Sequence, residues 1–192
     1  MRSRRGTPQR QAERLERHAI ETDPEAVLAA AIRLLEASPR SVADVRARLT
    51  RAGWPATLIE GAIERLTELG FLDDDAYARA WLESRDRARP RGERALKVEL
   101  RRKGVASDVA EAALGERREA AAASGDDEVM SADEVAAERL IARRASAMNR
   151  LPDGRARRQW AYALLARNGF DPDVAARVAG RAGSAEQSTD LE

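Results

Sequence analysis

The chain contains the hexapeptide LTRAGW at residues 49–54, and related hexapeptides return as LRRKGV at 100–105 and LARNGF at 165–170. In each one a leucine stands four residues before a glycine, an arginine stands two residues before it, and an apolar residue follows it. A glycine at this place is typical of a helix C-terminus. The recurrence predicts that one helical unit is used three times, and that function depends on the surface the stacked units present.

Composition favours helix throughout the chain. Of the 192 residues, 35% are charged and 4% are aromatic, and alanine, a strong helix former, is plentiful. No run of alternating β-branched residues stands between turn signals, so a sheet is not expected. A unit of about 45 residues is marginal alone, and three such units must bury surface against one another. We expect an all-α protein of three tandem three-helix (helix-turn-helix-like) repeats.

Capping and breaking residues set the boundaries of the predicted modules. Asp23-Pro24 joins an N-cap residue to a proline in the first helical turn, and Ser131 with Glu134 forms a capping box. The predicted organisation is a basic, flexible N-terminal extension at 1–22, three-helix repeats at 23–70, 71–118 and 132–180, an acidic linker at 119–131 and a disordered tail at 181–192.

The net charge of +1 hides a segregated distribution. Residues 85–103 contain nine basic and three acidic residues, and residues 138–183 contain ten arginines and four acids, whereas residues 115–134 contain two basic and seven acidic residues. Such segregation indicates a polyanionic partner, although solvated helix faces also produce it. The residues expected to bind a partner or nucleic acid are Arg85, Arg87, Arg89, Arg91, Lys97, Arg101, Arg102, Lys103, Arg155, Arg157, Arg158 and Arg167.

The first four arginines of this set alternate with other residues and flank Pro90. This pattern predicts an extended segment that presents several guanidinium groups along a path. The planar fork of arginine suits phosphates and carboxylates, and neutralising several phosphates makes binding strongly salt-dependent. The alternative is solvated charge with local acidic partners, such as Glu93 for Lys97.

The sequence argues against an enzyme. The only histidine is His18, there is no cysteine, and neither a P-loop nor a dinucleotide-binding glycine pattern is present. We therefore expect no catalytic residue, no metal and no cofactor. The run Asp73-Asp74-Asp75 lacks further metal ligands, so we expect it to interact with a helix N-terminus instead.

The aromatic residues are expected in the core. Phe71, Tyr77, Trp81, Trp160 and Phe170 stand at helix corners or on apolar faces, which favours packing over stacking on nucleic-acid bases.

Composition also predicts a cytoplasmic protein. The absence of cysteine excludes disulfides and is compatible with a reducing compartment. The longest apolar run, residues 26–32, is far shorter than the roughly 20 residues of a membrane helix. The basic N-terminus has no apolar segment of the kind found in signal peptides.

Residues 66–104 read LTELGFLDDDAYARAWLESRDRARPRGERALKVELRRKG. The informative positions are Gly70-Phe71-Leu72-Asp73-Asp74, Tyr77-Ala78, Arg85, Gly92, Glu99-Leu100 and Lys103-Gly104. This combination resembles the RecX family, the bacterial regulators of the RecA recombinase. The first and third modules are similar to repeats of that family too, so the resemblance covers roughly residues 26–178.

The resemblance implies an elongated, curved array of repeats that binds RecA and the RecA–single-stranded DNA filament. It also implies inhibition of recombinase, ATPase and coprotease activity in recombination and SOS repair, from a position in the helical groove of the filament. Some members of the family bind DNA themselves. We expect a monomer without membrane contact. Residues 1–22, 115–132 and 181–192 depart from the family pattern and receive no implied role.

An alternative function follows from the same helices. Three short helices with a tight turn before the third also describe helix-turn-helix DNA-binding domains, in which one helix enters the major groove. Such a protein acts on duplex DNA independently of RecA. A third option is a pure adaptor to another complex.

Overall fold

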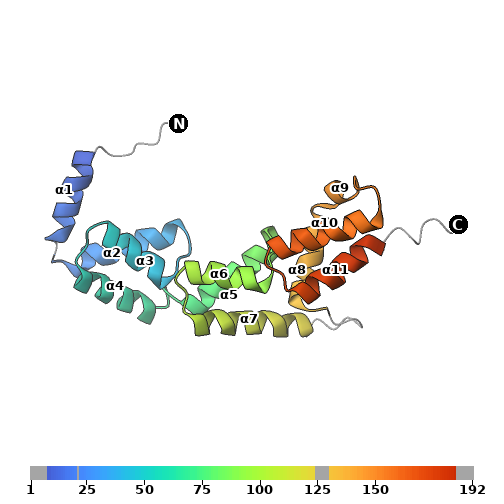
Figure 1. Ribbon diagram of the computed structural model, residues 1–192. Helices are drawn as coiled ribbons and strands as arrows, with labels where there is room; N and C mark the ends of the chain where they lie inside the picture. The colour runs from blue at the N-terminus through green and yellow to red at the C-terminus, as the bar shows by residue number, and fades with distance from the viewer. Residues whose placement is uncertain (1–7, 21, 124–129, 185–192) are drawn as a thin grey trace. The chain divides into compact units, whose positions relative to one another are not determined.

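The computed structural model describes residues 8–20, 22–123 and 130–184. Within these ranges the chain forms eleven helices and no strand (Figure 1), which confirms the all-α prediction. The helices are α1 (Pro8–Ala19), α2 (Pro24–Ala37), α3 (Val42–Arg51), α4 (Ala56–Glu68), α5 (Asp74–Ala88), α6 (Glu93–Arg102), α7 (Ser107–Ala122), α8 (Ala132–Ala142), α9 (Ala145–Met148), α10 (Gly154–Arg167) and α11 (Pro172–Ser184). None of the described helices combines the length and the apolar character that crossing a bilayer requires.

The chain divides into two compact units. The first contains the residues up to Tyr77 together with Lys103–Val105, and the second contains Ala78–Arg102 and the chain from Ala106 onward. In the first unit, α2, α3 and α4 pack around Val27, Val45 and Leu66, which have no exposed surface. Apolar residues recur at helical spacing on each of these helices, so each presents one apolar face to the shared core.

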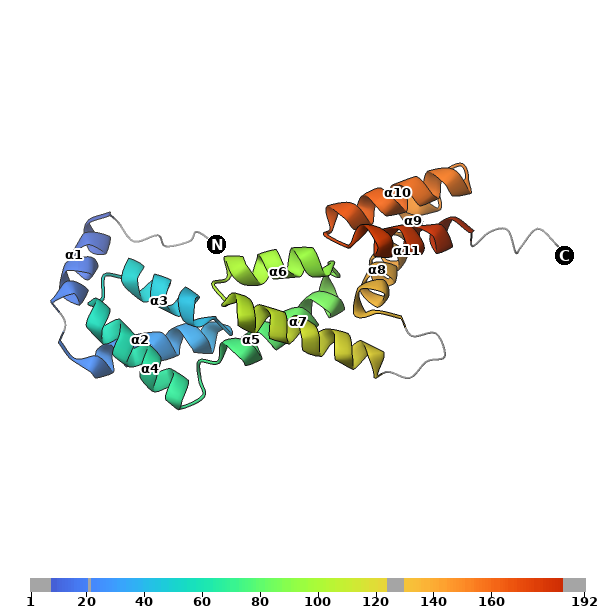
Figure 2. The same cartoon turned by 60° about the horizontal axis from the view of Figure 1, so that its bottom comes forward.

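The second unit contains two successive helical bundles. Helices α5, α6 and α7 bury Leu96, Leu100 and Leu114, and α8, α10 and α11 enclose a core that includes Leu165 and Phe170. Figure 2 shows these last three helices as one bundle, with the short α9 beside α10. The capping box predicted at the start of α8 is present, since Ser131 and Glu134 exchange hydrogen bonds.

The repeated hexapeptides form the ends of the second helix of each repeat. Their leucines are core residues, and Gly53, Gly104 and Gly169 have positive φ angles of 91°, 80° and 79°. Two of these glycines also lie in tight contact with a neighbouring repeat. A Cβ atom on Gly104 would lie 2.3 Å from the Cβ atom of Ala43, and one on Gly169 would lie 2.5 Å from that of Ala95. Glycine is required there both for its backbone angle and for the close approach.

We call the segments Ala52–Trp54, Lys103–Val105 and Asn168–Phe170 the glycine turns. In each of them the carbonyl before the glycine accepts a hydrogen bond from an element earlier in the chain. The donors are His18 Nδ1 to Ala52 O (2.8 Å), Ser41 Oγ to Lys103 O (2.5 Å) and the Gly92 amide to Asn168 O (3.1 Å). The same kind of hydrogen-bonded contact therefore occurs three times, which explains why the hexapeptide recurs.

The structure differs from the flexible extension expected at 1–22, because residues 8–19 form α1. The imidazole ring of His18 stacks on the Trp54 ring with centroids 3.8 Å apart, and Leu15 lies against Gly53. The sequence did not predict this contact, because α1 is mostly polar and charged and has few apolar residues. Helix α1 thus occupies the place on the first glycine turn that an upstream repeat would take.

The acidic linker and the tail also begin later than expected. Helix α7 continues to Ala122 and α11 continues to Ser184. Alanine-rich sequence around residues 119–123 favours the extra turn of α7. The remaining parts of these two predictions, like residues 1–7, lie outside the described residues.

Candidate nucleic-acid and partner interface

The basic run of residues 85–103 lies on the end of α5, on the segment that follows it, and on α6. The predicted extended path from Arg85 to Arg91 is wrong for its first half, because α5 continues to Ala88 and the Arg89 amide donates to the Arg85 carbonyl (2.8 Å). Pro90 disfavours helical backbone only in the residue before it. Residues that alternate in a helix point to different sides, so these arginines do not form one row.

Glu99 holds two of the predicted binding arginines. Arg85 Nε donates to Glu99 Oε2 over 2.6 Å, and Arg91 Nε lies 3.1 Å from Oε1. Trp81 Nε1 also donates to Glu99 Oε2 (3.1 Å), and the Arg85 guanidinium lies 4.4 Å from the centroid of the Trp81 ring. Since the Glu99 side chain is only 16% exposed, Arg85 and Arg91 stabilise the bundle rather than offer free charge.

Other cations of the run form surface ion pairs. The pairs are Arg87 with Glu83 (3.6 Å), Arg94 with Asp171 (2.8 Å) and Lys97 with Glu111. The hydrogen bond from Lys97 lowers the pKa of the Glu111 carboxyl. Glu93, the local partner considered for Lys97, instead accepts from Arg118 (2.6 Å). About half of the cations between residues 85 and 103 are therefore paired with acidic residues of the chain itself, as the alternative to a free binding surface predicted.

The remaining cations are exposed. Within the described ranges, no ion pair is formed by Arg89, Arg101, Arg102, Arg155, Arg158 or Arg167. Arg157 is half-buried, and Lys103 is exposed while its carbonyl belongs to a glycine turn. We call Arg101, Arg102 and Arg167 the helix-end arginines, because they lie in the last turns of α6 and α10.

The helix-end arginines have a defined separation. The bond between the Gly92 amide and Asn168 O places the end of α10 at the start of α6, as Figures 1 and 2 both show. Arg167 and Arg102 consequently lie near opposite ends of α6, whose ten residues span about 15 Å. The two bundles of the second unit thus present similar cationic groups at a spacing of one helix.

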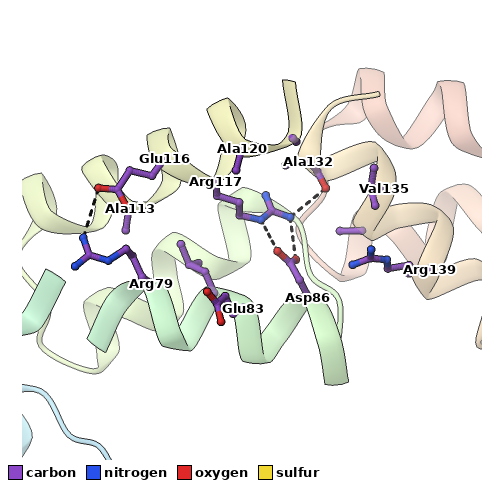
Figure 3. A pocket seen from close by; sticks show the side chains of 13 residues that line it. Arg79, Glu83, Asp86, Ala113, Glu116, Arg117, Ala120, Ala132, Val135 and Arg139 are labelled. Carbon is purple, nitrogen blue, oxygen red and sulfur yellow. Dashed lines mark hydrogen bonds and ion pairs between the residues drawn. The ribbon is translucent and has the colours of Figure 1, made fainter. Parts of the chain in front are cut away.

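A pocket of about 410 Å³ lies among α5, α7 and α8 (Figure 3). Its lining combines five alanines, Leu82 and Val135 with six charged residues, one of which is Arg117. Arg117 donates to Asp86 over 2.8 and 3.0 Å, to Asp133 Oδ1 over 2.9 Å and to the Ala132 carbonyl over 3.2 Å. These charged groups satisfy one another, so Arg117 joins α5, α7 and the start of α8 at one wall of the pocket.

Arg117 is a structural residue that sequence reasoning missed. Its side chain is 8% exposed. Burial alone would lower the pKa of its guanidinium, but the bonds to Asp86 and Asp133 offset burial and raise the pKa above its ordinary value. Arg117 lies in an acidic region, next to Arg118, and no pattern in the sequence separates the buried arginine from the exposed one.

The aspartate run at the start of α5 has structural partners. Asp73 Oδ1 accepts from the Ala76 amide (2.9 Å), as a helix N-cap does, and Asp74 accepts from the Val42 amide (2.9 Å). Among the residues that the structure describes, no three acidic or histidine side chains gather as they would around a metal ion. The predicted role at helix N-termini is therefore observed.

The aromatic prediction is right in part. Phe170 is 3% exposed, and Trp81 and Trp160 are half-buried. Phe71, however, is 67% exposed, so its predicted core position is wrong. It follows Gly70, where the chain reverses after α4, and only the next residue, Leu72, turns inward.

Sequence comparisons follow the same repeats. Residues 28–66 match the model for the first three-helix domain of RecX, and residues 73–114 match that for the second. The regulatory protein RecX of Thermobifida fusca is 33% identical over 147 residues, which cover 77% of this chain and 73% of that protein. The corresponding protein of Mycolicibacterium smegmatis is 40% identical over 85 residues, which cover 44% of this chain and 45% of that protein.

Solved structures show the same fold. The crystal structure of RecX from Lactobacillus salivarius aligns with a TM-score of 0.66 at 19% identity and covers 88% of this chain and 97% of that one. A second RecX crystal structure aligns with a TM-score of 0.65 and covers 81% of this chain and 72% of that chain.

Tandem three-helix repeats with exposed arginines at the helix ends define a helical-repeat protein with a basic surface. The relatives found by sequence carry the name of a regulatory protein. The chain belongs to the RecX family, which is a family of regulators and not of enzymes.

Proposed function

We propose that this protein binds RecA and RecA–single-stranded DNA filaments and inhibits their recombinase, ATPase and coprotease activities. The observation that carries the proposal is the set of helix-end arginines, which are exposed, form no ion pair with the described part of the chain, and recur at the same place in two successive bundles. A filament offers phosphates and carboxylates at regular intervals, and arginine binds both groups.

The proposed mechanism is differential binding. A repeat protein that contacts several RecA protomers at once gains affinity because each further contact is intramolecular. If it binds one conformation of the protomers better than the other, it shifts the filament away from its ATPase cycle. Such a mechanism requires no catalytic group.

RecA ATPase activity on single-stranded DNA, measured with and without the protein, tests this function. The variant Arg102→Glu/Arg167→Glu should inhibit the ATPase at least about tenfold less well than the unmodified chain. Two contacts to phosphates or carboxylates are lost, and the new glutamates repel those groups. A matched control is Arg14→Glu/Arg33→Glu, which reverses two exposed charges on the first unit and should inhibit normally.

Two results would contradict the proposal. Absence of any effect of the unmodified chain on RecA would reject the function, and equal loss in both variants would reject the helix-end arginines as its site. Binding to duplex DNA, to single-stranded DNA and to the filament separates the alternative function. Tight, sequence-selective duplex binding without RecA would favour a helix-turn-helix-like DNA-binding protein.

A further inference from the structure

The motif Gly70-Phe71-Leu72-Asp73-Asp74 contains one residue without a structural role. Gly70 adopts a φ of 73° after α4, Leu72 is 1% exposed, and Asp73 and Asp74 cap helix N-termini. Phe71 has none of these functions, because its ring is 67% exposed. Folding therefore does not account for an aromatic residue at this position.

A second Gly-Phe pair in the chain makes the contrast clear. Gly169 and Phe170 also follow a helix, yet Phe170 is 3% exposed and belongs to the core of its bundle. In a chain with only 4% aromatic residues, an aromatic ring left in solvent at a helix end is unusual. Single exposed apolar residues are common on protein surfaces, so the case for a binding role depends on how Phe71 is held and on its neighbours.

Phe71 is held in position before any partner binds. Its amide and the Leu72 amide both donate to the Leu66 carbonyl, over 2.8 and 3.1 Å, and the buried Leu72 side chain fixes the next residue. Leu69, two residues earlier, is 49% exposed. We call Leu69 and Phe71 the apolar knob. Because the backbone is already ordered, docking the knob costs little conformational entropy.

The charge around the apolar knob differs from that of the helix-end arginines. From Leu66 to Ala78 the chain carries four carboxylates and no basic residue, and Asp73 and Asp75 are exposed. Arg65 and Arg79 stand at the two ends of this stretch, and Arg65 pairs with Glu68 over 3.2 Å, but the exposed carboxylates of Asp73 and Asp75 still favour a protein partner over the phosphates of a nucleic acid. Such a surface fits a protein partner that has an apolar pocket and a cationic rim.

We propose that the apolar knob is the anchor of a protein–protein contact, with Phe71 inserted into an apolar, cation-rimmed pocket of the partner. The identity of the partner as a RecA protomer rests on the proposed function above. The chain then contacts the filament in two chemically distinct ways: the knob binds protein, and the helix-end arginines bind anionic groups. A large aromatic residue centred in a desolvated pocket typically dominates such a contact.

The test compares Phe71→Ala with Tyr162→Ala, which removes another partly exposed aromatic ring, 41% exposed on α10. Each protein is titrated against RecA filaments on single-stranded DNA and against the same DNA without RecA. Phe71→Ala should raise the Kd for filaments by about 10- to 100-fold, while Kd for bare DNA, helicity and melting temperature stay unchanged. Tyr162→Ala should bind both targets normally.

The outcomes separate this proposal from the proposed function. Filament binding by Phe71→Ala equal to that of the unmodified chain overturns the anchor and leaves the function intact. Equal weakening on filaments and bare DNA also overturns it, because the knob then acts on DNA or on folding. Failure of the unmodified chain to bind filaments overturns both.

Discussion

Asp74 Oδ1 accepts a hydrogen bond from the backbone amide of Val42, 32 residues earlier, over 2.9 Å. Asp133 Oδ2 accepts from the Glu93 amide over 3.0 Å in the same way. In both cases an aspartate at the start of one repeat caps the second helix of the repeat before it. With the glycine turns, these bonds give the N-termini of α3 and α6 the same two partners, one carboxylate and one backbone carbonyl.

Replacing Asp74 by alanine should lower the free energy of unfolding by about 1 kcal/mol, because it leaves a helix amide without its cap. Asp74→Asn keeps an oxygen acceptor and should recover most of this loss. Urea unfolding followed by circular dichroism measures both. The control is Asp75→Ala, an exposed member of the same run, and a loss as large in this control would show that the general negative charge matters rather than the bond.

Alanine at Gly104 should be strongly destabilising. The substitution forces a positive φ on a residue with a Cβ atom and places that atom 2.3 Å from Ala43, which should cost about 2–4 kcal/mol. Gly61→Ala is the matched control, since Gly61 lies within α4 and an added Cβ would meet no atom within 4 Å. This control should be stabilised by roughly 0.5–1 kcal/mol. The melting temperature should fall in Gly104→Ala and rise in Gly61→Ala. An unchanged melting temperature of Gly104→Ala would refute the close contact.

Arg117→Ala should destabilise the second unit by about 3–5 kcal/mol, because it leaves Asp86 and Asp133 partly buried without their cation. The neighbouring variant Arg118→Ala should cost less than about 1 kcal/mol, since Arg118 is exposed and its ion pair lies in solvent. Hydrogen exchange should show increased opening of α7 and α8 in Arg117→Ala only. Similar losses in the two variants would mean that helix propensity, not the buried network, controls stability.

Acid should weaken the third repeat through Glu134. The hydrogen bond from Arg177, followed by the bond to the Ser131 amide, lowers the pKa of Glu134 below its ordinary value of 4.5. A carboxyl whose pKa is lowered by folding stabilises the protein above its unfolded-state value, and this stabilisation disappears as the pH falls through the lowered pKa. The stability difference between the unmodified chain and Glu134→Gln should therefore be present at pH 7 and shrink below about pH 4.5. A difference that is constant from pH 7 to pH 3 would contradict this assignment.

Local patterns predicted much of the fold. The capping box at Ser131, the N-cap at Asp23 and the glycine ends of α3, α6 and α10 depend on neighbours within four or five residues, so the sequence contains the complete signal. The pairing of Arg85 and Arg91 with Glu99, and the docking of His18 on Trp54, join residues 8 to 36 positions apart. Spacing alone does not show which arginine meets a carboxylate, and the site prediction therefore included both paired and free cations.

By itself the sequence determined the helical class, the threefold reuse of one unit and the regions where positive charge gathers, because periodicity, capping and composition are properties of neighbouring residues. Only the tertiary structure decided which arginines remain free, which aspartates cap another repeat, and that Phe71 lies in solvent while Phe170 lies in the core. These distinctions depend on desolvation and on contacts between distant residues, and the same dipeptide or the same basic run is compatible with either outcome until the helices pack.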